Sequence, residues 1–216
     1  IIRDITQLKQ LEQIRKDFVA NVSHELRTPL TVLQGYLEMM EPEHLPQQAI
    51  WQKAHSVMLD QTKRMDNLVQ QLLTLSRIEA AAKVQYDENV DAPAMLVLLE
   101  QEAQSLNREK QHQINFEIDP DLRVNAITEE LRSAFSNLVT NAIKYTPDGG
   151  EIKVSWRREH HKAVFTVTDN GEGIAPQHVK RLTERFYRVD QARARNTGGT
   201  GLGLAIVKHV LSRHQS

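Results

Sequence analysis

The chain has 216 residues with 27 basic and 28 acidic side chains, so its formal net charge is −1 at pH 7. Balanced charge without a basic patch argues against a nucleic-acid-binding protein, and the absence of cysteine excludes disulfide scaffolds, thiolate zinc sites and cysteine nucleophiles. No apolar run approaches the roughly 18 residues of a membrane-spanning helix. Eight of the nine glycines lie between positions 149 and 203, so we expect the two halves of the chain to differ in structure.

The first half is predicted to fold as a helical hairpin. Apolar residues recur at steps of three and four from position 7 to about 41 and again from 47 to 79, a period typical of two long helices. A hairpin of two such helices cannot bury both apolar stripes alone, so we expect two chains to dimerise into a four-helix bundle. Residues 80–93 lose the periodicity and are predicted to be a linker.

Helices and strands alternate in the second half. Three segments have the apolar spacing of amphipathic helices, and three have the patterns of strands, the last two forming an antiparallel hairpin. The predicted helices are 94–111, 129–144 and 202–214, the strands are 113–118, 151–156 and 162–167, and the hairpin turn is 157–161. With one further strand left optional after the first, this order predicts an α+β sandwich whose helices cover one face of a mixed sheet.

The first candidate site is the segment SHELRTP, Ser23–Pro29. On a helix, His24 and Thr28 are one turn apart and face away from the apolar stripe, and Pro29 is expected to bend the helix beside them. A neutral imidazole is a nucleophile, and the neighbouring Glu25 can hold its Nδ1–H so that Nε2 is free to attack. The alternative is a solvent-facing histidine without a function, which is our interpretation of the other eight histidines.

The second candidate site is a polar helical stripe in NLVTNAIKYTP, formed by Asn137, Asn141, Lys144 and Tyr145. Asparagine is a mediocre helix former, so two on one face suggest a function. Their oxygens suit Mg²⁺, a lysine suits a phosphate, and a tyrosine ring can lie against a base. The alternative is an exposed polar face near the end of a helix.

Two glycine-containing segments are the remaining candidates. In TDNGEGI, Asp169 ends a predicted strand and is followed by Gly171 and Gly173, which allow a close approach of the backbone, although such a turn alone is common. In TGGTGLGL, glycine-rich backbone runs into a helix, and N–H groups at a helix N-terminus suit phosphate oxygens. This second segment does not match the P-loop pattern, and the alternative interpretation is a flexible linker. Its candidate phosphate-binding residues are Gly199, Thr200, Gly201, Leu202 and Gly203.

Five segments together resemble the transmitter region of bacterial sensor histidine kinases. In family order they are FVANVSHELRTPL (H box), NLVTNAIKYTP (N box), DNGEGI (first G box), ERFYRVD (F box) and TGGTGLGLAIV (second G box). The resemblance covers nearly the whole chain and implies an all-α hairpin that forms a dimeric four-helix bundle, followed by a Bergerat-type ATP-binding α/β sandwich. The implied domains are the end of a PAS-like domain or a signalling linker (1–6), a dimerisation and histidine phosphotransfer domain (7–80), a linker (81–92) and an ATP-binding catalytic domain (93–216).

The resemblance also implies a role for each residue. His24 is phosphorylated by ATP with Glu25 as the base, and Thr28 orients water when the kinase dephosphorylates its partner. For the nucleotide, Asp169 selects adenine, Tyr145 packs nearby, and Gly171 and Gly173 shape the turn. Asn141, helped by Asn137, holds Mg²⁺; Lys144 and Arg188 neutralise phosphates; Gly199, Thr200, Gly201, Leu202 and Gly203 form a lid on which Phe186 docks.

The implied partners are a second copy of the chain and a cognate response regulator, without nucleic acid. Contact with a membrane is expected only through segments outside this chain, which would be the cytoplasmic portion of a bacterial inner-membrane protein. Family members normally continue with two more strands, so the catalytic domain is expected to lack its last strands. One alternative is an ATPase or ATP-driven clamp of the same superfamily, which would have no HELRTP helix; the other is a pseudokinase scaffold, against which the presence of His24, Asn141 and Asp169 argues.

Overall fold

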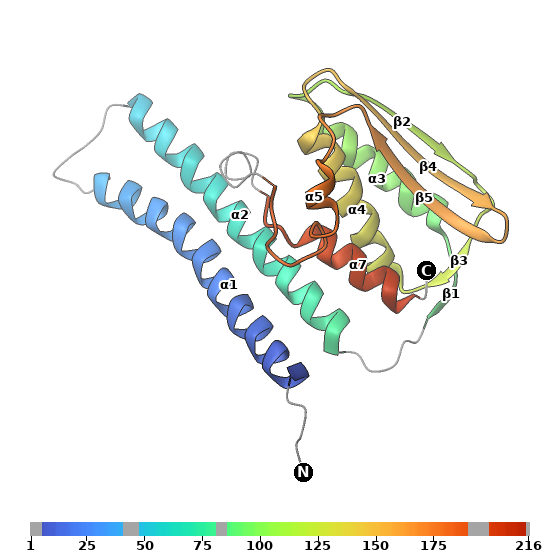
Figure 1. Cartoon of the computed structure of the whole chain (residues 1–216). Helices are drawn as coiled ribbons and strands as arrows, with labels where there is room; N and C mark the ends of the chain where they lie inside the picture. The colour runs from blue at the N-terminus through green and yellow to red at the C-terminus, as the bar shows by residue number, and fades with distance from the viewer. Residues whose placement is uncertain (1–5, 41–47, 81–85, 190–198, 215–216) are drawn as a thin grey trace, which may run out of the picture. The chain divides into compact units, whose positions relative to one another are not determined.

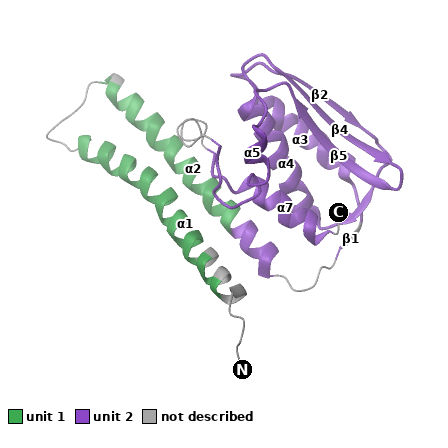
Figure 2. Cartoon of the chain, in the orientation of Figure 1, with its two compact units in different colours: residues 1–72 green, residues 73–216 purple. Residues whose placement is uncertain are grey.

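A computed structural model gives the fold and describes residues 6–40, 48–80, 86–189 and 199–214. Residues 1–5 of the predicted terminal segment, 81–85 of the predicted linker, and 190–198, where the F box ends and the second G box begins, lie outside the described residues. The chain divides into two compact units, residues 1–72 and 73–216 (Figure 2). Among the described helices, none combines the length and the apolar character needed to cross a lipid bilayer.

The first unit contains the predicted helical hairpin. Helix α1 (Thr6–Met39) packs beside α2 (Gln48–Ala80), whose last turns belong to the second unit (Figures 1 and 2). Pro29 lies within α1 and is buried in the hairpin, as are Ala54 and Leu68 of α2. The two long helices predicted from the apolar period are therefore confirmed.

The apolar arc of α1 is wider than the sequence analysis assumed. Val22 and Leu26 are half-buried, but Leu30 and Leu37 of the same predicted stripe are 46% and 59% exposed. A single partner helix covers only part of such an arc, because side chains on a helix project over a wide angle. The uncovered part is an apolar surface that a second hairpin can cover.

The second unit is built on a mixed three-stranded sheet. Strand β2 (Gln113–Ile118) pairs in parallel with β4 (Glu151–Glu159), which pairs antiparallel with β5 (Lys162–Asp169). Helices α3 (Ala92–Leu106), α4 (Thr128–Tyr145) and α7 (Gly203–Arg213) lie on one face of this sheet (Figure 1). The apolar core contains side chains from α3, α4 and the sheet, among them Leu96, Val139 and Val154. Helix α7 packs against α4, and its Ile206 is also buried. The predicted α+β sandwich is confirmed.

The segment predicted as a linker contains structure. Strand β1 (Asp87–Val90) pairs antiparallel with β3 (Val124–Ala126), so part of the predicted linker is a strand, which the loss of period did not predict. Helix α3 then begins at Ala92, because the carboxylate of Asp91 accepts a hydrogen bond of 3.0 Å from the N–H of Ala94 and caps the helix. This bond, followed by the bond to Arg123, lowers the pKa of Asp91.

Two other predicted boundaries are also wrong. Helix α3 ends at Leu106 instead of 111, because the side chain of Asn107 bonds to the backbone of His112 and a turn replaces the last helical turn. Strand β4 continues to Glu159, so the hairpin turn is His160–His161, with His160 at a φ of 55°. The short helix α5 (Pro176–Val179) was not predicted.

Candidate active site

His24 lies on the exposed face of α1. Thr28, one turn later, is exposed on the same face, and its hydroxyl donates a hydrogen bond of 3.3 Å to the carbonyl of His24. Both side chains therefore face away from the hairpin interior, as their spacing predicts. An imidazole open to solvent in this way can be reached by a phosphoryl donor.

Glu25 faces a different direction from His24, because neighbouring residues on a helix do not share a face. It is half-buried, and its Oε2 lies 3.5 Å from Nη2 of Arg64 on α2. This contact connects α1 to α2 directly beside the candidate phosphoacceptor. Arg64 was missed by the sequence analysis, because only the packing register of the two helices brings it next to Glu25.

The polar stripe predicted on α4 is present. Asn137, Asn141 and Lys144 are half-buried and Tyr145 is exposed. The amide nitrogen of Asn137 donates a hydrogen bond of 2.8 Å to the carbonyl of Ser133, so its Oδ1 faces Gly203 at the N-terminus of α7. The amide of Asn141 makes no side-chain hydrogen bond within the described part of the chain. Two amide oxygens on one helical face thus fit the oxygen ligands that Mg²⁺ takes.

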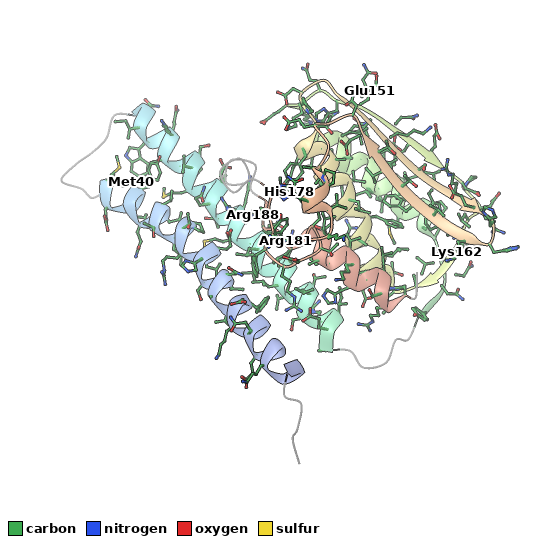
Figure 3. All side chains as sticks on the ribbon, viewed as in Figure 1. Met40, Glu151, Lys162, His178, Arg181 and Arg188 are labelled. Atoms are coloured by element: carbon green, nitrogen blue, oxygen red, sulfur yellow. The ribbon has the colours of Figure 1, made fainter. Side chains whose placement is uncertain are left out.

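Asp169 lies at the end of β5 and begins a tight turn. Its Oδ1 accepts a hydrogen bond of 3.0 Å from the N–H of Gly171. The next residue, Asn170, bonds to both backbone groups of Glu151, which is labelled at this end of the sheet in Figure 3. A Cβ on Gly171 would lie 3.2 Å from the carbonyl oxygen of Tyr145. The turn that carries Asp169 is therefore packed against the C-terminal end of α4.

The second glycine segment contacts α4 at two places. A Cβ on Gly203 would lie 2.5 Å from Oδ1 of Asn137, and one on Gly199 would lie 3.1 Å from the hydroxyl of Tyr145. The absence of a side chain at position 203 thus allows the N-terminus of α7 to approach the amide oxygen of Asn137 this closely. The N-terminus of α7 and the candidate magnesium ligands lie together, as a phosphate site requires.

The F box is bound to this segment through its backbone. The N–H of Phe186 donates a hydrogen bond of 2.8 Å to the carbonyl of Gly201, and both residues have a positive φ, 62° and 73°. A Cβ on Gly201 would lie 2.7 Å from the carbonyl carbon of Phe186. Leu202 is buried, and Thr200, also buried, accepts the N–H of Leu202 at 3.2 Å. Phe186 thus contacts the glycine segment, as predicted, but through main-chain atoms.

The segment between α5 and Arg188 is held by side-chain contacts that the sequence analysis did not predict. Nδ1 of His178 lies 2.6 Å from the hydroxyl of Tyr187, and the guanidinium of Arg181 lies 4.2 Å from the centre of the Tyr187 ring. Figure 3 labels His178, Arg181 and Arg188 in this part of the second unit. These contacts restrict the backbone that carries the half-buried Arg188.

The C-terminal end of α2 is attached to the same segment. Glu79 forms an ion pair with Arg185 of the F box and lies 3.4 Å from Nε2 of His209 on α7. Arg213 of α7 donates a hydrogen bond of 3.0 Å to the carbonyl of Ile78. Burial is the largest influence on His209 and lowers its pKa, although Glu79 acts in the opposite direction. Residues 73–80 are therefore structurally part of the second unit.

The residues of the second unit fit a nucleotide with Mg²⁺. The candidate residues are amide oxygens, the basic side chains of Lys144 and Arg188, and the N-terminus of an 11-residue helix, which lies against Asn137. Within the described residues no cluster of three or more histidine, aspartate or glutamate side chains forms a metal site by itself. The donor set suits a metal that is shared with phosphate oxygens, which is the usual form of a Mg²⁺ site at a nucleotide.

Two family models match the chain. The model of the His Kinase A (phospho-acceptor) domain matches residues 14–81, and that of the histidine kinase-, DNA gyrase B- and HSP90-like ATPase matches residues 126–216. The chain belongs to the sensor histidine kinases. The phospho-acceptor match argues against an ATPase or clamp without a phosphotransfer helix, and the ATPase match implies ATP binding.

Curated relatives narrow the family further. The chain is 50% identical over 216 residues to the phosphate regulon sensor protein PhoR of Pseudomonas aeruginosa. The aligned region covers 100% of this chain and 49% of that protein. It is 44% identical to PhoR of Haemophilus influenzae, over 100% of this chain and 50% of that protein. The amino-acid sequences of segments 26–40 and 184–199 predict a similarity to the phosphate-regulon sensor kinases, and these relatives confirm it. The chain spans about half the length of the curated relatives that it matches.

Solved structures agree on the fold. A structure of full-length ShkA in complex with AMPPNP has a TM-score of 0.62 and 26% identity, covering 91% of this chain and 41% of that one. The Acinetobacter baumannii histidine kinase AdeS has a TM-score of 0.67 at 24% identity, covering 88% of this chain and 86% of that one, which supports the fold alone. The same holds for ThkA in complex with the response regulator protein TrrA, with a TM-score of 0.66 at 20% identity, covering 87% of this chain and 57% of that one.

Proposed function

We propose that the chain is the catalytic portion of a phosphate-regulon type sensor kinase, which phosphorylates itself on His24 and passes the phosphoryl group to an aspartate of a response regulator. The observation that carries this proposal is the combination of an exposed histidine on a helical hairpin with a candidate nucleotide site in the same chain. In that site the second glycine segment lies directly against the side chain of Asn137. The similarity to PhoR proteins supports the regulatory role.

In the first step, the lone pair of His24 Nε2 forms a bond to the γ-phosphorus of ATP. The bond from that phosphorus to the bridging oxygen breaks, and ADP leaves. We assign the Nδ1 proton to Glu25 as the base, a role for which its carboxylate has to turn from Arg64 toward the imidazole of His24. Because the phosphoryl group itself reacts readily once it is aligned, the protein contributes positioning and charge neutralisation.

Each side of the nucleotide has its own residues. We assign the adenine side to Asp169, whose second carboxylate oxygen accepts a hydrogen bond from the exocyclic amine, and to Tyr145, whose exposed ring packs nearby. Gly171 and Gly173 keep that side of the pocket open. On the phosphate side, bound Mg²⁺ would neutralise phosphate charge, with Asn141 and Asn137 as its protein ligands. Lys144 and Arg188 bind phosphate oxygens, and the lid consists of Gly199, Thr200, Gly201, Leu202 and Gly203.

A dephosphorylation activity and the partners complete the proposal. Thr28 lies one turn from His24 with its hydroxyl near the exposed face, where it can orient a water toward the phosphoaspartate of a regulator. The uncovered apolar side chains of α1, including Leu30 and Leu37, support a homodimer through the hairpin. Because the relatives are about twice as long, we propose that this chain is the cytoplasmic portion of an inner-membrane sensor.

We retain the domain limits 7–80 and 93–216 as part of the proposal. The matched residues 14–81 and 126–216 lie within or close to these limits, while the compact units meet inside α2. The family ranges and the compact units differ because a family range is defined by similarity of sequence, whereas a compact unit is defined by contacts in the folded chain. Residues 73–80 therefore belong to the phosphotransfer helix in sequence and pack with the catalytic domain.

Incubation with γ-labelled ATP and Mg²⁺ tests the proposal. We expect label that is lost in acid and kept in base, as a phosphohistidine requires. His24→Gln should remove the label without weakening nucleotide binding, whereas Asn141→Ala should remove the label by weakening binding. His55→Gln is the matched control, because His55 is an equally exposed histidine on α2 and should label normally. Label that persists in His24→Gln would refute the assignment of His24.

A further inference from the structure

The C-terminal end of α4 is the part of the molecule from which Lys144 and Tyr145 extend. The last carbonyls of a helix have no partner within the helix and need donors from elsewhere. The carbonyl of Ala142 accepts both the N–H and the hydroxyl of Thr146, at 3.0 and 2.7 Å. The next two carbonyls, of Ile143 and Lys144, receive their donors from a turn more than 30 residues earlier in the chain.

That turn, residues 107–112, supplies one imidazole and one ammonium group. Nε2 of His112 lies 3.1 Å from the carbonyl of Ile143, and because a carbonyl only accepts, this nitrogen carries the proton. Nζ of Lys110 lies 3.4 Å from the carbonyl of Lys144 and 3.3 Å from that of Thr146. A cation at this position also suits the negative end of the helix dipole. His112 and Lys110 together cap the end of α4.

The turn is built to hold these two groups in place. His112 is 5% exposed and Asn107 is 6% exposed. The side chain of Asn107 bonds to both backbone groups of His112, accepting its N–H at 2.8 Å and donating to its carbonyl at 2.7 Å. The carbonyl of Lys110 accepts the N–H of Gly149 at 2.8 Å. The cap is therefore attached on both sides, to the end of α4 and to the turn that follows it.

The end of α4 also contacts the adenine side of the candidate site. A Cβ on Gly171 would lie 3.2 Å from the carbonyl oxygen of Tyr145 and 3.6 Å from Cα of Thr146. A displacement of this helix end therefore changes the distance between Tyr145 and the turn that carries Asp169. The position of the cap and the shape of the nucleotide pocket are mechanically linked.

We propose that Lys110 and His112 are positioning residues for nucleotide binding. They do not contact the nucleotide; they hold the end of α4 so that Tyr145 and Lys144 face the pocket that Asp169 closes from the other side. The inference rests on the proposed function for the identity of the pocket. It adds two residues that lie outside every segment of the kinase resemblance and outside both matched domain ranges.

The test measures the dissociation constant of the fluorescent nucleotide TNP-ATP and the rate of His24 labelling at increasing ATP. Lys110→Met keeps the length of the side chain and removes its donors, and because Lys110 is partly exposed we expect the variant to fold. We expect the dissociation constant and the KM for ATP to rise by about threefold to tenfold, with kcat at saturating ATP unchanged. Lys110→Arg and His112→Gln, which keep a donor, should restore binding relative to Lys110→Met and His112→Leu.

Two controls separate this role from others. Asp148→Asn removes the exposed ion pair of Lys110, at 3.4 Å, but leaves its contacts to the carbonyls, and should bind TNP-ATP normally. Lys153→Met removes a comparable surface lysine on β4 and should also bind normally. Unchanged TNP-ATP binding in Lys110→Met, or no rescue by Lys110→Arg, would overturn the inference. Failure of the unaltered protein to bind TNP-ATP would instead count against the proposed function.

Discussion

His24 lies on the exposed face of one helix, whereas the residues proposed to bind the nucleotide come from four segments between positions 137 and 203 that are packed against one another. The side chain of His24 needs only the correct helical face, and α1 provides that face through its apolar period. Around Asn137, Tyr145 and Asp169, the structure instead depends on glycines at which an added Cβ would lie only 2.5 to 3.1 Å from a neighbouring side-chain atom.

This difference determines what a substitution does in each region. On the exposed face of α1, a side chain can be changed with little effect on the fold, so its chemistry can be tested separately. In the second unit, a substitution at the glycine segment changes backbone geometry, and through it both stability and nucleotide binding. The two regions should therefore respond oppositely to the same chemical change.

Adding one methyl group to a glycine gives the largest contrast. Gly201→Ala places a residue at a φ of 73° with its Cβ 2.7 Å from the Phe186 backbone, and we expect a loss of about 2–5 kcal/mol in the free energy of unfolding, together with weaker nucleotide binding. Gly35→Ala, on α1 with nothing within 4 Å of its Cβ, should stabilise the chain by about 0.5–1 kcal/mol.

The two tryptophans allow this to be measured unit by unit. Trp156 is buried in the second unit and Trp51 lies on α2 in the first, so urea unfolding followed by Trp156 fluorescence in a Trp51→Phe background reports the second unit. Circular dichroism reports the helical hairpin in the same samples. A Gly201→Ala variant that unfolds at the unaltered urea concentration would show that the glycine segment is not locked onto the F box.

The elements with a strong period were predictable. The apolar spacing gave both long helices to within a residue or two, and the alternation in QINFEI gave β2 with its observed limits. The candidate site residues were found by a different signal, the occurrence of five short segments in the order that the family has. Their mutual contacts, such as Gly203 beside Asn137, follow from the fold and not from their spacing in the sequence.

The elements that were missed are held by long-range contacts. The short strand β1 exists because it pairs with β3, and its four residues have no period that distinguishes them from a linker. Arg64, Lys110 and His112 belong to no motif, and each acts on a backbone or side chain more than 30 residues away. A local pattern cannot predict such a partner, because the partner is chosen by packing.

An intermediate effect, on chemistry alone, is expected at Thr28. Thr28→Ala removes an exposed hydroxyl that donates a 3.3 Å bond to a carbonyl of its own helix, so the free energy of unfolding should change by less than about 0.5 kcal/mol. Release of phosphate from a phosphorylated response regulator should slow, while labelling of His24 continues. Thr28→Ser, which keeps the hydroxyl, is the matched control. Equal losses of both activities would mean that Thr28 supports the helix and does not orient water.

The smallest effect tests the region where the two domains meet in sequence, the end of α2. Burial lowers the pKa of His209, and Arg185 and Lys208 lower it further, while the negative charge of Glu79 raises it. The imidazole of His209 therefore takes up a proton less readily in the folded protein than in the unfolded chain. Its contribution to the free energy of unfolding is complete above the unfolded pKa of about 6.5 and is lost as the pH falls below that value. His209→Gln should therefore reduce the loss of stability of the second unit between about pH 7.5 and pH 5.5.

A second variant, Glu79→Gln, makes this prediction specific to the contact between the C-terminal end of α2 and α7. Glu79→Gln removes the charge that opposes the other influences, so the pKa of His209 should fall further and the second unit should lose more stability on acidification than the unaltered protein. Urea midpoints from Trp156 fluorescence at the two pH values give both slopes. If Glu79→Gln and His209→Gln change the slope in the same direction, α2 does not end against α7 in solution, and the last turns of the phosphotransfer helix belong with the hairpin instead.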